Sequence, residues 1–211
     1  MRTPLGTEVN YTEMIIGVEM SNNYVIKNSV GQQIFTAREE DSDFLTMQYF
    51  GPLRPFSIRI QDNFGRDVLV VTRPVSWGAC CFPCCLQEME IQSPNGVPIG
   101  YVVQNWHPLL PKFTVMDAAR SAQLKIKGPC CAYRCSSDVV FQVLSRDEEN
   151  LVGQISKQWA GFLQEALTDA DNFGISFPMD LNVRVKALLL GAVFLIDFMY
   201  FETNKNSPYY I

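Results

Sequence analysis

The sequence has little of what most enzymes and nucleic-acid-binding proteins depend on. Histidine occurs once, at His107, which excludes a His-rich zinc site and disfavours a Ser-His-Asp triad. Acidic residues outnumber basic ones by 22 to 17, so the net charge is −5 and a nucleic-acid partner is not expected. No Gly-rich loop carries a lysine that could cradle a nucleotide phosphate. We therefore expect a protein that is not an enzyme and needs no ATP.

An apolar run of the kind found in secretory signals is also missing from the first residues, which favours a reducing compartment. The seven cysteines then need an explanation other than disulfides. With 211 residues and 47% hydrophobic content, the chain is long enough for one domain with a real core. We place this domain at residues 15–202, between an N-terminal tail at 1–14 and a C-terminal tail at 203–211.

Short alternating apolar runs recur in pairs, and a polar turn separates the two runs of each pair. Five such hairpins centre near residues 31, 65, 96, 119 and 149. The Asp-Asn-Phe-Gly of the second turn returns at 171–174, which predicts a sixth hairpin whose return strand includes Leu181, Val183 and Val185. Six hairpins give about twelve strands, and a meander of that length protects its edges most simply by closing into an antiparallel barrel. The predicted fold class is mainly β.

One segment has the length and composition of a buried helix. Residues 187–201 are apolar around the whole helical circumference apart from Asp197, which is typical of a helix buried on all sides or in lipid. At about 1.5 Å per residue this segment is about 22 Å long, short of the roughly 30 Å of a bilayer core. We favour a helix that fills the barrel, with a membrane span as the alternative.

The cysteines form two clusters between predicted strands, and three interpretations stay open. They could be small buried hydrophobes, although four cysteines in six residues are dense for packing. Cys81 and Cys84 with Cys131 and Cys135 have spacing acceptable for a tetrathiolate zinc site. Thioester acylation of an exposed loop is the interpretation we favour, and two or more acyl chains would anchor the protein firmly. The acylation candidates are Cys80, Cys81, Cys84 and Cys85.

The segment from Asp169 to Asp180 aligns with an EF-hand calcium loop, with carboxylates at its first, third and last positions and the required glycine in the middle. The alignment is imperfect, because phenylalanines stand at two ligand positions and the last carboxylate is Asp rather than Glu. An ordinary hairpin turn is the alternative. The candidate calcium ligands are Asp169, Asp171, Phe173, Ile175 and Asp180.

Several motifs together resemble the phospholipid scramblase family. They are Arg54-Pro55-Phe56, the paired cysteines followed by residues 86–91, Gly100-Tyr101-Val102, Trp106-His107-Pro108, and residues 168–181 followed by 195–198. The resemblance covers roughly residues 15 to 202, and a match of this length and order is highly specific.

The resemblance implies a tubby-like barrel of twelve strands around a C-terminal helix. It further implies calcium-responsive, ATP-independent movement of phospholipids between leaflets, with palmitate on the first cysteine cluster and calcium at residues 169–180. The expected localisation is the plasma membrane, with the domain on the cytoplasmic side. The chain lacks the Pro-rich N-terminal extension of longer members, so SH3 and WW partners are not expected. A palmitoyl-anchored barrel that binds lipids or proteins without moving lipid is the alternative function.

Overall fold

The structure is a computed structural model that describes residues 11–20, 23–40, 55–74, 86–130, 139–158 and 172–201. These residues form strands and one helix, and in most strands buried side chains alternate with more exposed ones. The first six strands are β1 (Tyr11–Met20), β2 (Asn23–Asn28), β3 (Gln33–Glu39), β4 (Phe56–Asp62), β5 (Asp67–Arg73) and β6 (Glu88–Gln92). The remaining elements are β7 (Pro98–Asn105), β8 (Lys112–Asp117), β9 (Ala122–Lys127), β10 (Val139–Ser145), β11 (Leu151–Gln158), β12 (Asn172–Pro178) and helix α2 (Val183–Tyr200).

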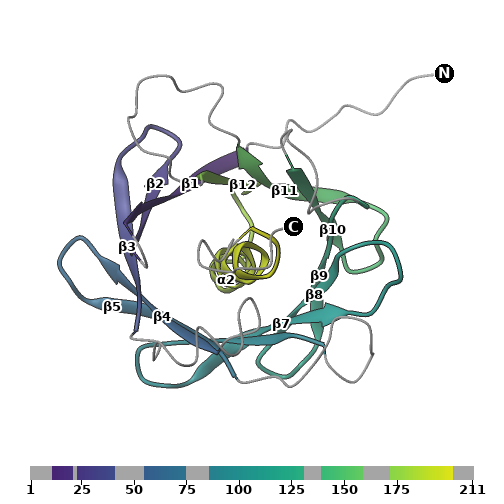
Figure 1. The fold of residues 1–211 in the computed structure, drawn as a ribbon, viewed down its shortest axis with the longest axis horizontal. Helices are drawn as coiled ribbons and strands as arrows, with labels where there is room; N and C mark the ends of the chain where they lie inside the picture. Colours follow the sequence, from purple (N-terminus) through teal and green to yellow (C-terminus); the bar gives the residue numbers. More distant parts are fainter. Residues whose placement is uncertain are drawn as a thin grey trace, which may run out of the picture.

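The strands form a closed antiparallel barrel in which each strand pairs with its neighbours in sequence, and β1 pairs with β12 to close the ring. Figure 1 shows the ring with α2 running through its centre. Closure leaves no unpaired edge strand, which removes the usual route to edge-to-edge aggregation. The predicted mainly β fold, a twelve-stranded barrel around a C-terminal helix, is confirmed.

The five predicted hairpins have a common turn geometry. The fourth residue of each polar turn has a positive φ, which is 81° at Gly31, 74° at Gly65 and 76° at Gly96. Arg120 and Glu148 take the same place in the fourth and fifth turns, with φ of 60° and 62°. Glycine suits this conformation because it has no Cβ, and the two non-glycine residues adopt it at some cost.

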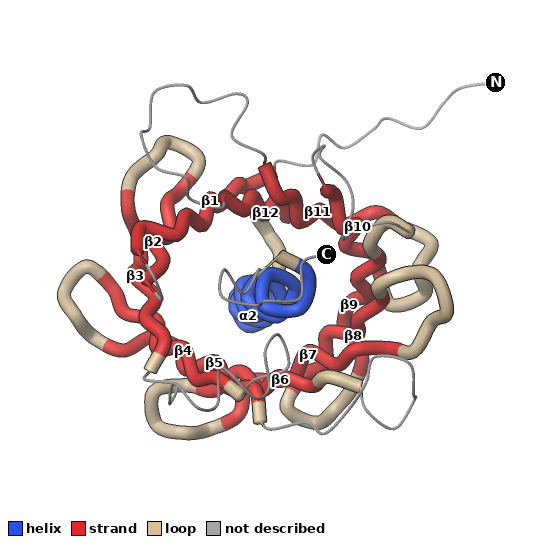
Figure 2. The backbone as a smooth tube through the Cα atoms, in the orientation of Figure 1, coloured by secondary structure: helices blue, strands red, loops and turns tan. Residues whose placement is uncertain are grey.

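Helix α2 fills the barrel because its residues from Leu188 to Phe198 are buried without interruption. Figure 2 shows it surrounded by the strands on every side. Asn182 caps its start, since the Asn182 side chain accepts a hydrogen bond of 2.8 Å from the backbone N–H of Arg184. The helix passes so close to β6 that a Cβ on Gly191 would lie 2.7 Å from Cγ1 of Ile91. Within the described part of the chain, no helix has both the length and the apolar character needed to cross a membrane.

The sixth hairpin was predicted wrongly. Residues 172–174 lie inside β12 rather than in a turn, and Gly174 faces Ile15 of β1 on one side and Ser156 of β11 on the other. Val183 and Val185, predicted in a strand, belong to the first turn of α2, so the helix begins before residue 187. The twelfth strand is instead β1, which begins at Tyr11 inside the predicted N-terminal tail. The barrel selects this arrangement because Phe173, Ile175 and Phe177 alternate toward the core.

The alternating strand directions give the barrel two different ends. Five short turns and the β12–α2 connection lie at one end, which we call the hairpin end. At the other end each odd-numbered strand finishes and the next even-numbered strand begins, and we call this the loop end. The connections that leave and re-enter the barrel there include 40–55, 74–87, 106–111, 128–138 and 159–171. Contacts of Phe201 with Phe141 and Phe173, which lie near the starts of β10 and β12, place the C-terminal end of α2 at the loop end too.

Candidate functional site: the loop end of the barrel

Cysteine and tryptophan share one kind of position in the order of strands along the chain. All seven cysteines and all three tryptophans fall on connections that join odd-numbered to even-numbered strands. The cysteines are Cys80, Cys81, Cys84, Cys85, Cys130, Cys131 and Cys135, and the tryptophans are Trp77, Trp106 and Trp159. Cysteine is the site of thioester acylation, and tryptophan is enriched where proteins meet the membrane–water interface. Of these residues the structure describes Trp106 and Cys130, and both lie at the loop end.

The connection 106–111 forms the best described part of this end. Trp106 and Leu109 expose 52% and 67% of their surface, which is unusual for large apolar side chains. The Nδ1 atom of His107 accepts the backbone N–H groups of Leu109 at 3.2 Å and Leu110 at 2.9 Å. His107 therefore shapes this connection, and its Nδ1 atom is engaged in doing so.

A cavity of about 180 Å³ opens beside this connection. Leu86, Trp106, His107, Leu110, Cys130 and Tyr200 are among the residues that line it. Leu86 directly follows the first cysteine cluster in the chain, and Cys130, which is an exposed free thiol, begins the second. The cavity therefore lies between the attachment points of both cysteine-bearing segments and the last turn of α2.

Inside the barrel, cations pack on aromatic rings near the same end. The guanidinium of Arg73, at the end of β5, lies 4.8 Å from the ring centre of Phe56 and 5.9 Å from that of Phe198. The ammonium of Lys157, near the end of β11, lies 4.3 Å from the ring centre of Phe201. Both cations are almost fully buried, at 1% and 4% exposure, so the rings replace part of the hydration that burial removes.

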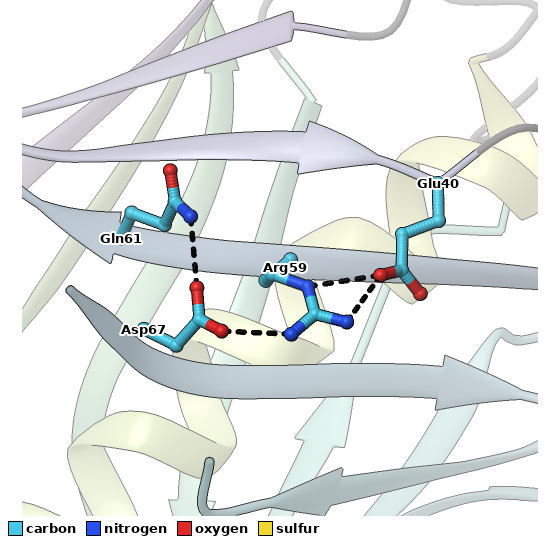
Figure 3. A network of polar contacts seen from close by, with 4 residues as sticks. All are labelled: Glu40, Arg59, Gln61 and Asp67. Carbon is cyan, nitrogen blue, oxygen red and sulfur yellow. Dashed lines mark hydrogen bonds and ion pairs between the residues drawn. The ribbon is translucent and has the colours of Figure 1, made fainter. Parts of the chain in front are cut away.

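Charges on the outer face of β3, β4 and β5 are paired (Figure 3). Arg59 donates to Glu40 through Nε at 2.9 Å and to Asp67 through Nη1 at 2.7 Å, and Gln61 donates to Asp67 at 2.8 Å. The hydrogen bond from Arg59 holds the pKa of Glu40 below its ordinary value. Hydrogen bonds from Gln61 and then Arg59 lower the pKa of Asp67 in the same way. Arg59 therefore joins three strands and stabilises the ionised form of both carboxylates.

The candidate calcium ligands are not gathered into one loop. Phe173 and Ile175 lie in β12 with their side chains in the core, at 2% and 1% exposure, and their backbones pair with β1 and β11. Asp180 is exposed at the hairpin end, beyond the other end of the strand. Asp169 and Asp171 lie outside the described residues. Among the residues that are described, no three His, Cys, Asp or Glu side chains come together as a metal site.

The candidate acylation sites Cys80, Cys81, Cys84 and Cys85 also lie outside the described residues, as do the zinc candidates Cys131 and Cys135. Acylation, zinc and calcium stay predictions. Sequence reasoning missed the cavity beside Trp106 and the role of His107 in its wall. The signal available was the pair of prolines around this connection, Pro108 and Pro111, which indicates a fixed loop rather than a simple turn.

Comparison with known proteins defines the class to which this barrel belongs. A family model described as Scramblase matches residues 6–203. Phospholipid scramblase 1 of Rattus norvegicus is 55% identical over 200 residues, which cover 95% of this chain and 59% of the rat protein. Phospholipid scramblase 2 of Bos taurus is 53% identical over 200 residues, 95% of this chain and 68% of the bovine protein. Phospholipid scramblase family member 5 of Homo sapiens is 49% identical over 195 residues, 92% of this chain and 72% of the human protein.

The chain belongs to the scramblase family. It spans about three fifths of the length of the rat and mouse proteins, at 59% and 61%. No solved structure matches it.

Proposed function

We propose that this protein moves phospholipids between the two leaflets of a membrane, in both directions and without ATP. Its similarity to proteins named phospholipid scramblase supports lipid scrambling. The observation that carries the proposal on this chain is that every cysteine and every tryptophan belongs to a connection between strands whose described flanking residues lie at the loop end. Acyl chains on the cysteines and tryptophan side chains at the interface would hold this end against the lipid surface.

In the proposed arrangement the domain lies on the cytoplasmic face of the plasma membrane, where cysteines stay reduced and open to acylation. Palmitate on Cys80, Cys81, Cys84 and Cys85 would supply more than one acyl chain, which stable anchoring requires. Leaflet exchange of phospholipid runs downhill and breaks no covalent bond, so the protein would act as a transporter and not as an enzyme.

The test is reconstitution of the purified full chain in vesicles that carry a fluorescent phospholipid in both leaflets. Dithionite bleaches the outer-leaflet label, so we expect bleaching beyond that fraction when protein and calcium are present. Bleaching that stays at the level of protein-free vesicles would rule out lipid movement by this chain. A variant with Cys80, Cys81, Cys84 and Cys85 changed to alanine is expected to lose membrane association when expressed in cells.

We also propose that calcium regulates this movement, through Asp169 and Asp171. Two carboxylates lie within three residues of each other there, and β12 separates them from Asp180 by seven residues, which is about 23 Å of extended chain. Asp171→Asn is therefore expected to abolish the calcium response, whereas Asp180→Asn leaves it intact. Calcium titrations of the bleaching rate for both variants check this, and equal loss in both would contradict the assignment.

A second candidate function is an acyl-anchored barrel that binds lipids or proteins and moves no lipid. The uninterrupted burial of α2 within the barrel favours it, because a helix that fills a barrel offers no apolar face to lipid. The two functions differ in the bleaching assay alone, since both predict membrane association that depends on the four cysteines. Association without bleaching would select the second.

A further inference from the structure

A cleft of about 210 Å³ on β8 and β9 contains three lysines. Lys112, Lys125 and Lys127 line it together with Asn105 and Glu148. Their charges sum to 3 − 1 = +2, in a chain whose overall charge is −5. The cleft is therefore a positively charged site on a protein whose net charge is negative.

The strand register explains why the lysines converge. Lys112 of β8 is directly opposite Lys127 of β9, and Thr114 is directly opposite Lys125. Residues two apart on a strand share a face, so all three lysines lie on the same face of the sheet. Like charges directly opposite each other destabilise a sheet, so the pairing of Lys112 with Lys127 has a cost, which the single carboxylate of Glu148 offsets only in part.

The lysines are also less exposed than is usual. All three are half-buried, and the side chain of Lys112 exposes 27% of its surface. Glu148 supplies the carboxylate in the lining, 3.3 Å from the ammonium of Lys112. On β4, by contrast, a single arginine has two carboxylates around it (Figure 3).

Hydrogen bonds fix the donors of the cleft. Lys125 donates to the Thr114 hydroxyl at 2.8 Å, and that hydroxyl donates to Oδ1 of Asn105 at 2.6 Å. This leaves two N–H groups of the Lys125 ammonium and the amide N–H groups of Asn105 for a ligand. A compact site with several N–H donors and a net charge of +2 matches a dianion that has several acceptor oxygens.

We propose that this cleft binds a phosphate monoester, carried on the headgroup of a membrane lipid such as a phosphorylated inositol lipid. A phosphate monoester carries about −1.5 to −2 charges at neutral pH, close to the charge of the site, whereas a phosphodiester carries less. Asn105 and Lys127 end their strands and Lys112 begins its own at the loop end, while Glu148 reaches the cleft from the β10–β11 turn. The choice of a lipid over a free phosphate rests on one part of the proposed function, namely that the loop end faces the membrane.

The test measures binding of the full chain to two kinds of phosphatidylcholine vesicle. One contains a small fraction of phosphatidylinositol bisphosphate, and the other contains phosphatidylserine at equal total charge. We expect tighter binding to the first, and competition by soluble inositol trisphosphate. Lys127→Gln is expected to weaken binding to the first vesicle roughly fivefold, and Lys112→Gln with Lys127→Gln roughly 25-fold. The matched control, Lys27→Gln with Arg184→Gln, removes two exposed cations at the hairpin-end termini of β2 and α2 and should leave the preference unchanged.

Equal binding to both vesicles, or equal losses in the cleft and control variants, would show attraction to charge density alone and would overturn the site. Tight binding of inositol trisphosphate with no vesicle preference would overturn the lipid source. Thermal melting of each variant checks that it folds, and inorganic phosphate should raise the melting temperature of the wild type more than that of Lys127→Gln at matched ionic strength. Because this assay measures binding, it can succeed where the bleaching assay fails, and the reverse also holds.

Discussion

At the scale of single residues, Gly191 sets how closely α2 can pack against β6. A methyl group there would meet Cγ1 of Ile91 at 2.7 Å, which is closer than real contacts of this kind. Gly191→Ala should therefore destabilise the protein by about 1 to 3 kcal/mol, as overpacking of a full core does. Urea unfolding measures this loss.

A double-mutant cycle tests the cause. Ile91→Ala alone should cost about 2 to 5 kcal/mol. The double variant should be no less stable than Ile91→Ala, because the new methyl group then occupies space that Ile91 has vacated. Simple addition of the two losses would mean that Gly191 is needed for some reason other than this contact.

For the pair of Lys112 and Lys127 we predict a substitution that stabilises the protein. Lys127→Gln removes a charge that directly faces Lys112, so it should raise the free energy of unfolding by about 0.2 to 1 kcal/mol at low salt. The gain should shrink as salt screens the repulsion. Lys27→Gln is the matched change, and no gain is expected there because Lys27 is opposite Ile15. A loss of stability in Lys127→Gln would show that the pair is not under repulsion.

At the scale of elements, Arg59 joins β3, β4 and β5 and makes the stability of this region depend on pH. The pKa values of Glu40 and Asp67 are lowered in the folded state, so their contribution is present above their ordinary values of 4.5 and 3.8. It is lost as the pH falls below those values and the carboxylates take up protons. Arg59→Gln should lower the melting temperature at neutral pH, and its difference from the wild type should shrink in acid.

Arg184→Gln provides the comparison, because Arg184 is an exposed cation at the start of α2. The difference in melting temperature between Arg184→Gln and the wild type should stay constant as the pH falls through the acid range. A difference for Arg59→Gln that stays constant down to the lowest pH would mean that the two carboxylates do not titrate with this arginine.

The elements also show which parts of the fold could be predicted from the sequence. Ten strands followed from local signals, because alternation and polar turns with positive φ are contained within short windows. The closing pair, β1 and β12, has no turn between its strands, so no local pattern indicates it. The repeated Asp-Asn-Phe-Gly gave the wrong prediction of a sixth hairpin for the same reason. The same residue types form a turn at 62–65 and part of a strand at 172–174, and the difference depends on pairing with distant strands. The lysine cleft depends on the register of Lys112 and Lys127, fifteen positions apart.

At the scale of the whole molecule, either end of the barrel is a candidate for the surface that binds the membrane. The loop end exposes Trp106 and Leu109, while the hairpin end exposes Phe64 at 84% and Val30 at 78%. Apolar exposure alone therefore does not select an end, whereas the proposed acylation of the cysteines favours the loop end. We expect Trp106→Ala with Leu109→Ala to weaken binding to vesicles roughly tenfold or more, since burying each large side chain contributes about 1.5 to 3 kcal/mol.

The matched control is Phe64→Ala with Val30→Ala, which removes comparable apolar surface from the hairpin end and should leave vesicle binding unchanged. Both pairs lie on exposed connections, so neither should alter the core or the melting temperature greatly. The measurement is vesicle co-sedimentation of full chains that carry no acyl group, which isolates the contribution of the side chains. If the hairpin-end pair weakens binding and the loop-end pair does not, the barrel meets the membrane by its other end, and the cysteine-bearing connections would have to reach the bilayer from the far side of the domain.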